Sequence, residues 1–215
     1  MQKIAGTALY SLALVGGVCL ASGRSHALVA GQESKNALVV EKSVITRDDG
    51  ADGPGTVILE VDHRETGDPP DTVRIRAVLN GPLRGEGAED LYALSAGIRF
   101  SSERLSFVPG SLRKGELLEQ DGRSSLITAG TAPGPKTLLT IGASRIGAVP
   151  GIKAPSGRMV LFSLALKVRS AGDIPLSWER ASFIDSKVHP VHAARFVDGT
   201  LHVEGHPLAS SIKEN

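Results

Sequence analysis

The chain has few aromatic residues and almost no cysteine. Its 215 residues include five Phe, two Tyr, one Trp and one Cys. A single Cys excludes a disulfide framework within the chain and any zinc site built from several cysteines. The scarcity of aromatic rings disfavours surfaces that stack bases or sugars on aromatic side chains.

The chain also lacks an excess of charge of either sign. It has 24 Lys and Arg against 23 Asp and Glu, a formal net charge of +1. This balance provides no general attraction to nucleic acid or to anionic membranes. Hydrophobic residues make up 41% and charged residues 22% of the chain, a composition typical of a globular protein rather than of a disordered one.

Residues 1–27 have the pattern of a secretory signal peptide. Lys3 is the only charge in the first 23 residues, and an apolar stretch follows it. Ser25-His26-Ala27 offers the small-x-small pattern of a cleavage site, and Ala21 offers a second one. The stretch is also long enough to stay as a membrane anchor, and Cys19 is a candidate for lipidation, although Val precedes it. We therefore expect a secreted protein, periplasmic or extracellular, that contacts a membrane only if this segment is retained.

Cleavage after Ala27 would change two properties of the chain. It would remove Lys3 and Arg24 but no acidic residue, so the balance becomes 22 against 23 and the formal charge −1. It would also remove the only Cys, Cys19, and leave no thiol to mispair in an oxidising compartment.

The remaining sequence shows the period-two apolar pattern of β-strands. Residues 28–55 are polar and rich in turn signals, which predicts a flexible linker or N-terminal extension. Residues 56–205 contain short alternating segments separated by Gly and Pro, without helical periodicity. We predict an all-β domain over 56–205, an antiparallel β-sandwich with jelly-roll topology and about nine strands, followed by a C-terminal tail, 206–215. The expected strands are 56–62, 72–79, 91–100, 105–108, 124–128, 137–144, 159–168, 174–178, 181–185, 193–197 and 200–203.

Three of these segments carry more specific expectations. Residues 159–168 are largely apolar on both faces up to Ala165, which predicts a central strand. Residues 72–79 alternate apolar side chains with Arg74 and Arg76, which predicts one buried and one solvated face. Asp198-Gly199 is a strong signal for a two-residue hairpin turn between the last two strands.

No catalytic constellation emerges from the sequence. Gly142–Gly147 is one residue away from a nucleophile elbow, and no helix is expected after it. Gly130–Thr137 has the outline of a phosphate loop, but Pro135 lacks an N–H that could contact phosphate. We therefore predict that the chain is not an enzyme.

Candidate metal ligands are equally weak. Residues 48–53 resemble the start of a calcium loop, but Gly50 occupies the third position and Leu59 the twelfth. His202, Glu204 and His206 would share one face of a strand, without an evident fourth ligand. We expect no metal and no cofactor.

The aromatic residues after residue 27 are mostly expected in the core. Tyr92, Phe100 and Phe162 fall on the apolar faces of their strands, and core placement is also expected for the remaining Phe residues, Phe107, Phe183 and Phe196. Only Trp178 remains as a candidate platform for stacking a sugar ring.

The order of several short motifs resembles that of bacterial cohesin domains. The resembling segments are Pro70–Ile75 at a strand start, Leu91–Phe100 with the following Ser101–Leu112 and Gly115, the long apolar Gly157–Val168, and the closing Phe183–Ser186 and Phe196–Val203. Ser101-Ser102 departs from this pattern, because the family usually has Asp-Pro there, and the 145–157 loop is long.

The resemblance covers about 56–205 and implies a non-catalytic module that binds a helical, calcium-loaded dockerin of another protein through one flat sheet face. By strand correspondence this face would include 91–100, 124–128, 137–144 and 181–185. The residues that we expect to contact the partner are Ser95, Arg99, Thr140 and Ser144. The alternative is a carbohydrate-binding sandwich of the same superfold, acting in polysaccharide binding or degradation, with Trp178 as its stacking residue.

Overall fold

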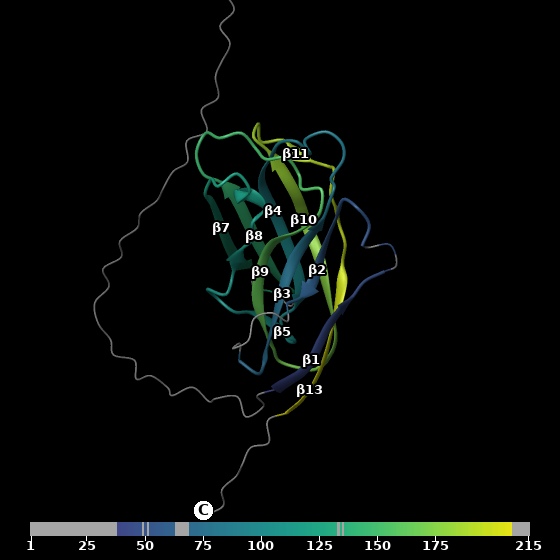
Figure 1. Ribbon diagram of the computed structural model, residues 1–215. Coiled ribbons are helices and arrows are strands. Elements are labelled where there is room, and N and C mark those ends of the chain that lie inside the picture. The colour runs from purple at the N-terminus through teal and green to yellow at the C-terminus, as the bar shows by residue number, and fades with distance from the viewer. Residues whose placement is uncertain are drawn as a thin grey trace, which may run out of the picture. The chain divides into compact units, whose positions relative to one another are not determined.

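The computed structural model describes residues 38–48, 50, 52–62, 69–132, 134 and 136–207. These residues form two packed β-sheets, and their only helical element is the 3₁₀ turn η1 (Leu117–Glu119) (Figure 1). The prediction of an all-β sandwich is confirmed; the described residues form thirteen strands in place of about nine, because several are only two or three residues long. No helix in this part of the chain is long and apolar enough to cross a membrane. The predicted signal segment, 1–27, lies outside the described residues.

One sheet has seven strands in the order β1-β13-β10-β4-β8-β7, with β11 paired to β10. All of its neighbouring strands are antiparallel. Its strands are β1 (Leu38–Thr46), β4 (Leu91–Ser101), β7 (Ser125–Ala132), β8 (Lys136–Arg145), β10 (Gly172–Asp185), β11 (Pro190–Val191) and β13 (Gly199–Pro207). The two edges of this sheet are therefore β1 and β7.

The other sheet has six strands in the order β12-β2-β3-β9-β5, with β6 also paired to β9. Its strands are β2 (Thr56–Val61), β3 (Thr72–Asn80), β5 (Leu105–Phe107), β6 (Arg113–Lys114), β9 (Arg158–Val168) and β12 (Arg195–Phe196). β9 lies between β3 on one side and β5 and β6 on the other, and its residues 161–166 are all buried, as predicted for a central strand.

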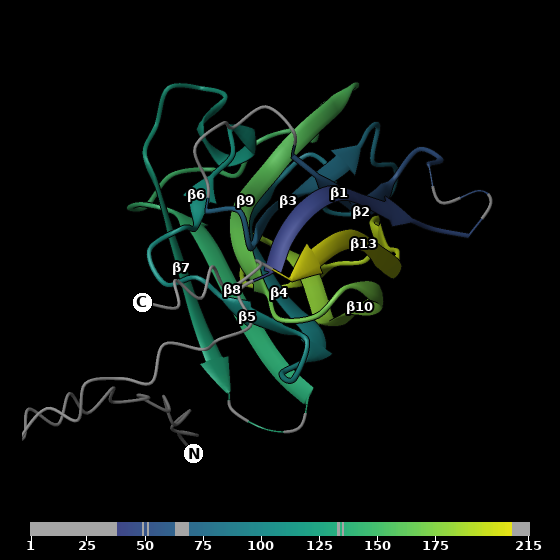
Figure 2. The same cartoon turned by 90° about the horizontal axis from the view of Figure 1, so that it is seen from below.

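The core lies between the two sheets, which face each other in Figure 2. Each large apolar side chain that is fully buried there contributes roughly 1.5–3 kcal/mol relative to an exposed one. The largest are Phe100, Phe162, Phe183, Leu59, Ile75, Leu79, Leu91, Ile98, Leu105, Leu139 and Ile141.

The hairpin predicted at Asp198-Gly199 is wrong. β12, just before it, pairs in parallel with β2 of the six-stranded sheet, whereas β13 begins at Gly199 in the seven-stranded sheet. The two residues carry the chain between sheets, and Asp198 Oδ1 accepts a hydrogen bond of 2.8 Å from the backbone N–H of Trp178. A turn signal is local, but which strands pair is decided by packing between distant segments.

The predicted linker and tail also need correction. Residues 38–46, inside the predicted linker 28–55, form β1, which pairs with β13 from Leu38–Pro207 to Thr46–Thr200. β13 likewise continues to Pro207, into the predicted tail. The register shifts between Val40 and Lys42, and this irregularity breaks the alternation by which a strand is identified in a sequence.

Other strand boundaries differ from the prediction. The expected strands 174–178 and 181–185 are one strand, β10, whose register shifts between Glu179 and Ser182 around Arg180, a residue with a φ of 50°. The loop expected at Gly130–Pro135 is shorter than predicted, because β7 runs to Ala132 and β8 begins at Lys136.

The outward face of β3 is not uniformly solvated. Arg74 is buried, and its Nη1 donates to the Ser111 carbonyl at 3.2 Å. The expectation of a solvated face is therefore wrong at Arg74, because the segment after β5 supplies a backbone acceptor that the local pattern does not indicate.

Candidate functional site

The outer face of β7, β8, β4 and β10 is the surface on which the predicted partner-binding residues lie. Antiparallel register aligns its outward side chains in four rows across the strands. The rows are Leu126–Ser144–Ala93–Ile184, Thr128–Gly142–Ser95–Ser182, Gly130–Thr140–Gly97–Glu179 and Ala132–Leu138–Arg99–Ser177. We call this surface the four-row face. Eleven of these sixteen residues are Gly, Ala, Ser or Thr, so most of the face has low relief.

The structure brings all four predicted residues onto the four-row face. Ser95 and Arg99 come from β4, and Thr140 and Ser144 come from β8, its antiparallel neighbour. Thr140 is exposed and the other three are half-buried. The Ser144 hydroxyl donates to the Arg145 carbonyl at 2.9 Å. Contact of these residues with a partner remains a prediction.

Arg99 does not stand alone on this face. Its Nε donates to Glu179 Oε2 at 2.6 Å, and Nη2 pairs with the same carboxylate oxygen. Such a partly exposed ion pair contributes little stability, but it cancels the charge of the guanidinium. Glu179 was not identified from the sequence, because its position beside Arg99 depends on the register between β4 and β10, which the sequence does not reveal.

Gly97 and Gly142 keep the centre of the four-row face low. A Cβ on Gly97 would lie 2.7 Å from the Glu179 carbonyl oxygen and 2.9 Å from a Leu138 methyl, so a side chain there would displace β10 or β8. At Gly142 a Cβ would meet only a Thr128 methyl at 3.8 Å. Glycine is therefore required for strand packing at the first position, whereas the second has room for a side chain.

One end of the four-row face is apolar and exposed. Leu126 in the first row is 62% exposed, and Ile146, two residues beyond Ser144, is 57% exposed. Ile184 at the opposite end of the first row is half-buried. Grouped large apolar side chains at a surface are typical of interaction sites.

The outer face of the six-stranded sheet is chemically different. Glu60 on β2 accepts a hydrogen bond of 3.3 Å from Arg76 Nε on β3 and a shorter one from Arg158. Arg47 Nη1 lies 4.0 Å from the same carboxylate. Long charged side chains therefore stand on this face, in contrast to the small residues of the four-row face.

Trp178 points into the sandwich. Its ring meets Phe196 and Phe162 edge to face, with centroid distances of 5.2 and 6.4 Å, and Nε1 donates to the Val197 carbonyl at 3.0 Å. Its predicted use as a flat, exposed stacking platform is thus contradicted by its position. Across residues 38–207, no aromatic side chain that the structure describes is fully exposed.

The other aromatic residues follow the prediction with one exception. Phe100, Phe162 and Phe183 are buried in the core, and Phe107 and Phe196 pack against it. Tyr92 is only half-buried, because its hydroxyl reaches the surface and donates to the Gly147 carbonyl at 2.8 Å.

The histidines of β13 are held by separate carboxylates. His202 Nδ1 lies 2.6 Å from Asp173, and His206 Nδ1 lies 3.0 Å from Glu41. In the described part of the chain, no three His, Cys, Asp or Glu side chains gather into a group that could hold a metal ion.

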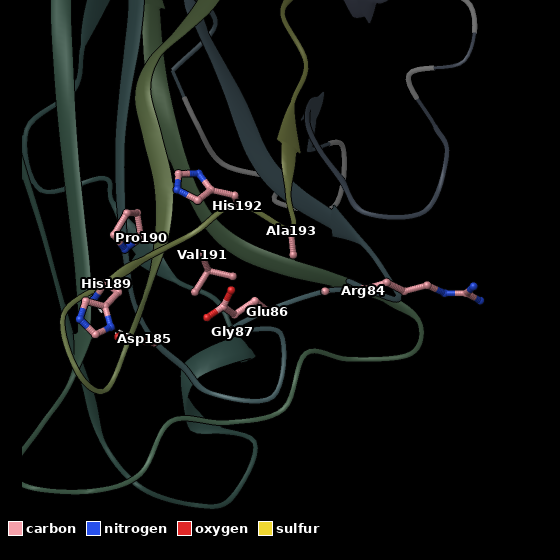
Figure 3. Close-up of a pocket in the computed structure, with 10 residues that line it drawn as sticks. Arg84, Glu86, Gly87, Asp185, His189, Pro190, Val191, His192 and Ala193 are labelled. Carbon is pink, nitrogen blue, oxygen red and sulfur yellow. Dashed lines mark hydrogen bonds and ion pairs between the residues drawn. The ribbon is translucent and has the colours of Figure 1, made fainter.

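A hollow of about 470 Å³ lies beside the end of β10, where Figure 3 shows Asp185, His189 and Val191 near one another and Arg84 extending away. The Asp185 carboxylate accepts hydrogen bonds from the backbone N–H groups of His189 (2.7 Å) and Lys187 (2.9 Å). These bonds lower the pKa of Asp185. Its carboxylate therefore fixes the turn after β10 rather than reaching into the hollow as a free base.

The fold is cohesin-like by comparison with solved structures. A type II cohesin domain from the cellulosome of Acetivibrio cellulolyticus matches with a TM-score of 0.51 and 9% identity, over 70% of this chain and 95% of that one. Type II cohesin A11 from Bacteroides cellulosolvens matches with a TM-score of 0.51 and 13% identity, over 69% and 98%. The sixth cohesin of scaffoldin B from A. cellulolyticus, solved in complex with a Cel5 dockerin, matches with a TM-score of 0.47 and 16% identity, over 71% and 100%. No protein-family model and no curated protein matches the chain.

Proposed function

We propose that this chain, whose sandwich has the cohesin-like fold, is a secreted, non-catalytic module that binds a dockerin-type protein through the four-row face. The observation that carries the proposal is the contrast between the two outer faces. One is a low surface of small residues with an apolar end, and the other is occupied by paired arginines and acidic residues.

The dimensions of the four-row face suit a helical partner. Four strands spaced about 4.8 Å apart span about 15–20 Å, and a helix with its side chains is about 10–12 Å across. Small residues at the centre, such as Gly142 and Ser95, allow a helix to approach the sheet closely. Leu126 and Ile184 at the ends of the first row would supply apolar anchors of the kind that dominate binding energy.

The polar residues have distinct roles in this proposal. The hydroxyls of Ser95, Thr140 and Ser144 supply hydrogen-bond donors and acceptors along the face. Arg99 in the fourth row is already paired with Glu179 in the third row, so the two charges of the four-row face cancel each other. The face therefore favours a partner helix whose contacting side is apolar and polar-uncharged rather than strongly acidic.

Calorimetric titration against a panel of purified, calcium-loaded dockerins tests the proposal. Thr140→Arg places a long cation in the third row and should weaken binding at least about tenfold. Ser156→Arg adds the same side chain at an exposed position away from the face and should leave binding unchanged. Equal effects of the two variants, or no binding of the unmodified chain to any dockerin, would reject the proposal.

Affinity electrophoresis on polysaccharide gels tests the alternative. Retardation of a chain that binds no dockerin would replace protein recognition with sugar recognition. Secretion rests on the sequence pattern of residues 1–27, and mass spectrometry of the exported protein would show whether the chain begins after Ala27, after Ala21 or at neither.

A further inference from the structure

β7 lies at the margin of the seven-stranded sheet in both views (Figures 1 and 2). It pairs with β8 over eight successive residues without a register shift, so its edge is regular. Ile146 N donates to the Ser124 carbonyl at 3.1 Å, which places the backbone groups of Ser124 on the β8 side. In an antiparallel pair, successive residues direct their backbone groups alternately toward and away from the neighbouring strand. Ser125 and every second residue after it therefore direct their N–H and C=O away from β8.

These outward backbone groups are unpaired along most of the strand. The N–H of Ser125 donates to Glu119 Oε1 at 2.7 Å, which closes the start of the edge. For Ile127, Ala129 and Thr131, the residues that the structure describes supply no backbone partner on this side. Three successive sites, each with one donor and one acceptor, are therefore without a backbone partner in a single copy, and β6 lies near β7 without pairing with it.

The β7 edge also lacks the features that normally prevent strands from pairing between molecules. Natural edge strands are shortened, bulged or charged. β1, the other edge of the sheet, has a register shift and carries Glu41 and Lys42. β5, β6 and β12 are two or three residues long. β7 is eight residues long, Ser-Leu-Ile-Thr-Ala-Gly-Thr-Ala, with neither a charge nor a proline.

We propose that β7 pairs antiparallel with β7 of a second copy of this chain, which forms a two-fold dimer with a continuous sheet. The outward groups of β7 are centred on Ala129, so the two-fold register places Ala129 opposite Ala129 of the second copy and Ile127 opposite Thr131. The strand complements itself in length, and no residue of β7 carries a charge that would repel β7 of the other copy. Leu126, 62% exposed in one copy, comes to lie opposite Ala132 of the other, which covers part of its apolar surface.

This pairing does not depend on dockerin binding. It uses the backbone edge of β7, whereas the four-row face uses outward side chains, so either proposal can fail without the other. If both hold, the two-fold axis places two four-row faces side by side on one sheet surface.

Sedimentation velocity over a concentration series tests the dimer. Ala129→Pro deletes an N–H that faces away from β8, so it removes intermolecular hydrogen bonds and leaves the β7–β8 ladder intact. We expect Ala129→Pro to weaken dimerisation at least about tenfold, and Ala129→Ser, which keeps the N–H, to change it little. A monomer at every concentration, or a dimer insensitive to Ala129→Pro, would overturn the proposal.

A crosslinking experiment tests the register even if Ala129→Pro fails to fold. In a chain with Cys19→Ser, Thr128→Cys and Gly130→Cys together place each new thiol directly opposite the other in the second copy. Gly130 has room, because a Cβ there meets nothing within 4 Å. Thr128→Cys alone is the matched control, because its thiol and that of the second copy would be diagonal neighbours, roughly 7–8 Å apart, beyond the usual disulfide range. Mild oxidation should link the double variant and not the control; equal linking of both, or of neither, would reject this pairing.

Discussion

Arg145 has a guanidinium group that is buried in the sandwich. Its replacement tests how much its contacts with η1 and the following turn stabilise the domain. Its side chain has 0% exposure. Nη1 donates to the buried Leu118 carbonyl at 2.8 Å and Nη2 to Asp121 Oδ2 at 2.5 Å, while Nε has no partner among the described residues. The side chain thereby fastens η1 and the turn after it to β8.

The expected cost of replacing Arg145 follows from these contacts. Arg145→Met keeps most of the volume but leaves the Leu118 carbonyl buried without a donor, which costs about 1–3 kcal/mol of unfolding free energy. Arg145→Ala removes the packed stem as well and should cost about 2–5 kcal/mol. Asp121→Asn should cost less than either, because the amide oxygen can still accept the hydrogen bond from Nη2 and only the counter-charge of the buried guanidinium is lost.

Urea unfolding followed by circular dichroism measures all three variants. The order of loss should be Arg145→Ala, then Arg145→Met, then Asp121→Asn. A buried cation with an unpaired Nε also carries a desolvation cost, which the methionine would relieve. If Arg145→Met proves as stable as the unmodified chain, this cost outweighs the two hydrogen bonds and the reasoning is refuted.

Three further predictions concern single side chains. The pKa of Glu119 is lowered from 4.5 to about 2, chiefly by its hydrogen bond with Lys114. Because its folded pKa lies below its unfolded pKa, its stabilising effect should be present above pH 4.5 and lost as pH falls toward 2. If Glu119→Gln shows the same dependence of unfolding free energy on pH as the unmodified chain, this prediction is contradicted. Trp178→Phe should cost about 0.5–1.5 kcal/mol in thermal unfolding through loss of the bond to the Val197 carbonyl, and an unchanged stability would show that this bond contributes nothing. Val188 is exposed with a φ of 68°, so Val188→Gly should raise the unfolding free energy by about 1 kcal/mol; a destabilised variant would show that the unfolded-state entropy of glycine outweighs the relief of backbone strain.

Strands with a regular period-two pattern of apolar residues were predictable from the sequence. β2, β3, β4 and β9 appear where the period-two pattern places them, because one or both of their faces are buried in a continuous core. β1 was missed because its bulge at Val40 and Lys42 interrupts the alternation. The Asp198-Gly199 hairpin was mispredicted because turn propensity is local, whereas the sheet that each flanking strand joins depends on distant packing.

Only those features of the four-row face that follow from the alternation of side chains along a strand could be predicted from the sequence. The outward positions of Ser95, Arg99, Thr140 and Ser144 follow from strand periodicity, and the structure places them together. The Arg99–Glu179 pair depends on the register between β4 and β10, which a bulge near Arg180 shifts. The inward orientation of Trp178 likewise depends on its partners across the core, which no pattern near it in the sequence indicates.

The pairing of β1 with β13 determines how the domain responds to mechanical load. Leu38 and Pro207 lie opposite each other at one end of this antiparallel pair, so tension applied at these two residues loads the hydrogen bonds one after another rather than all at once. The pair should therefore unzip at low force from Leu38 toward Thr46, and release of the nine residues of β1 would yield about 30 Å of chain. β13 and β10 separate β1 from β4, β8 and β7. The domain can therefore lengthen under tension by release of β1 while most of the four-row face keeps its structure.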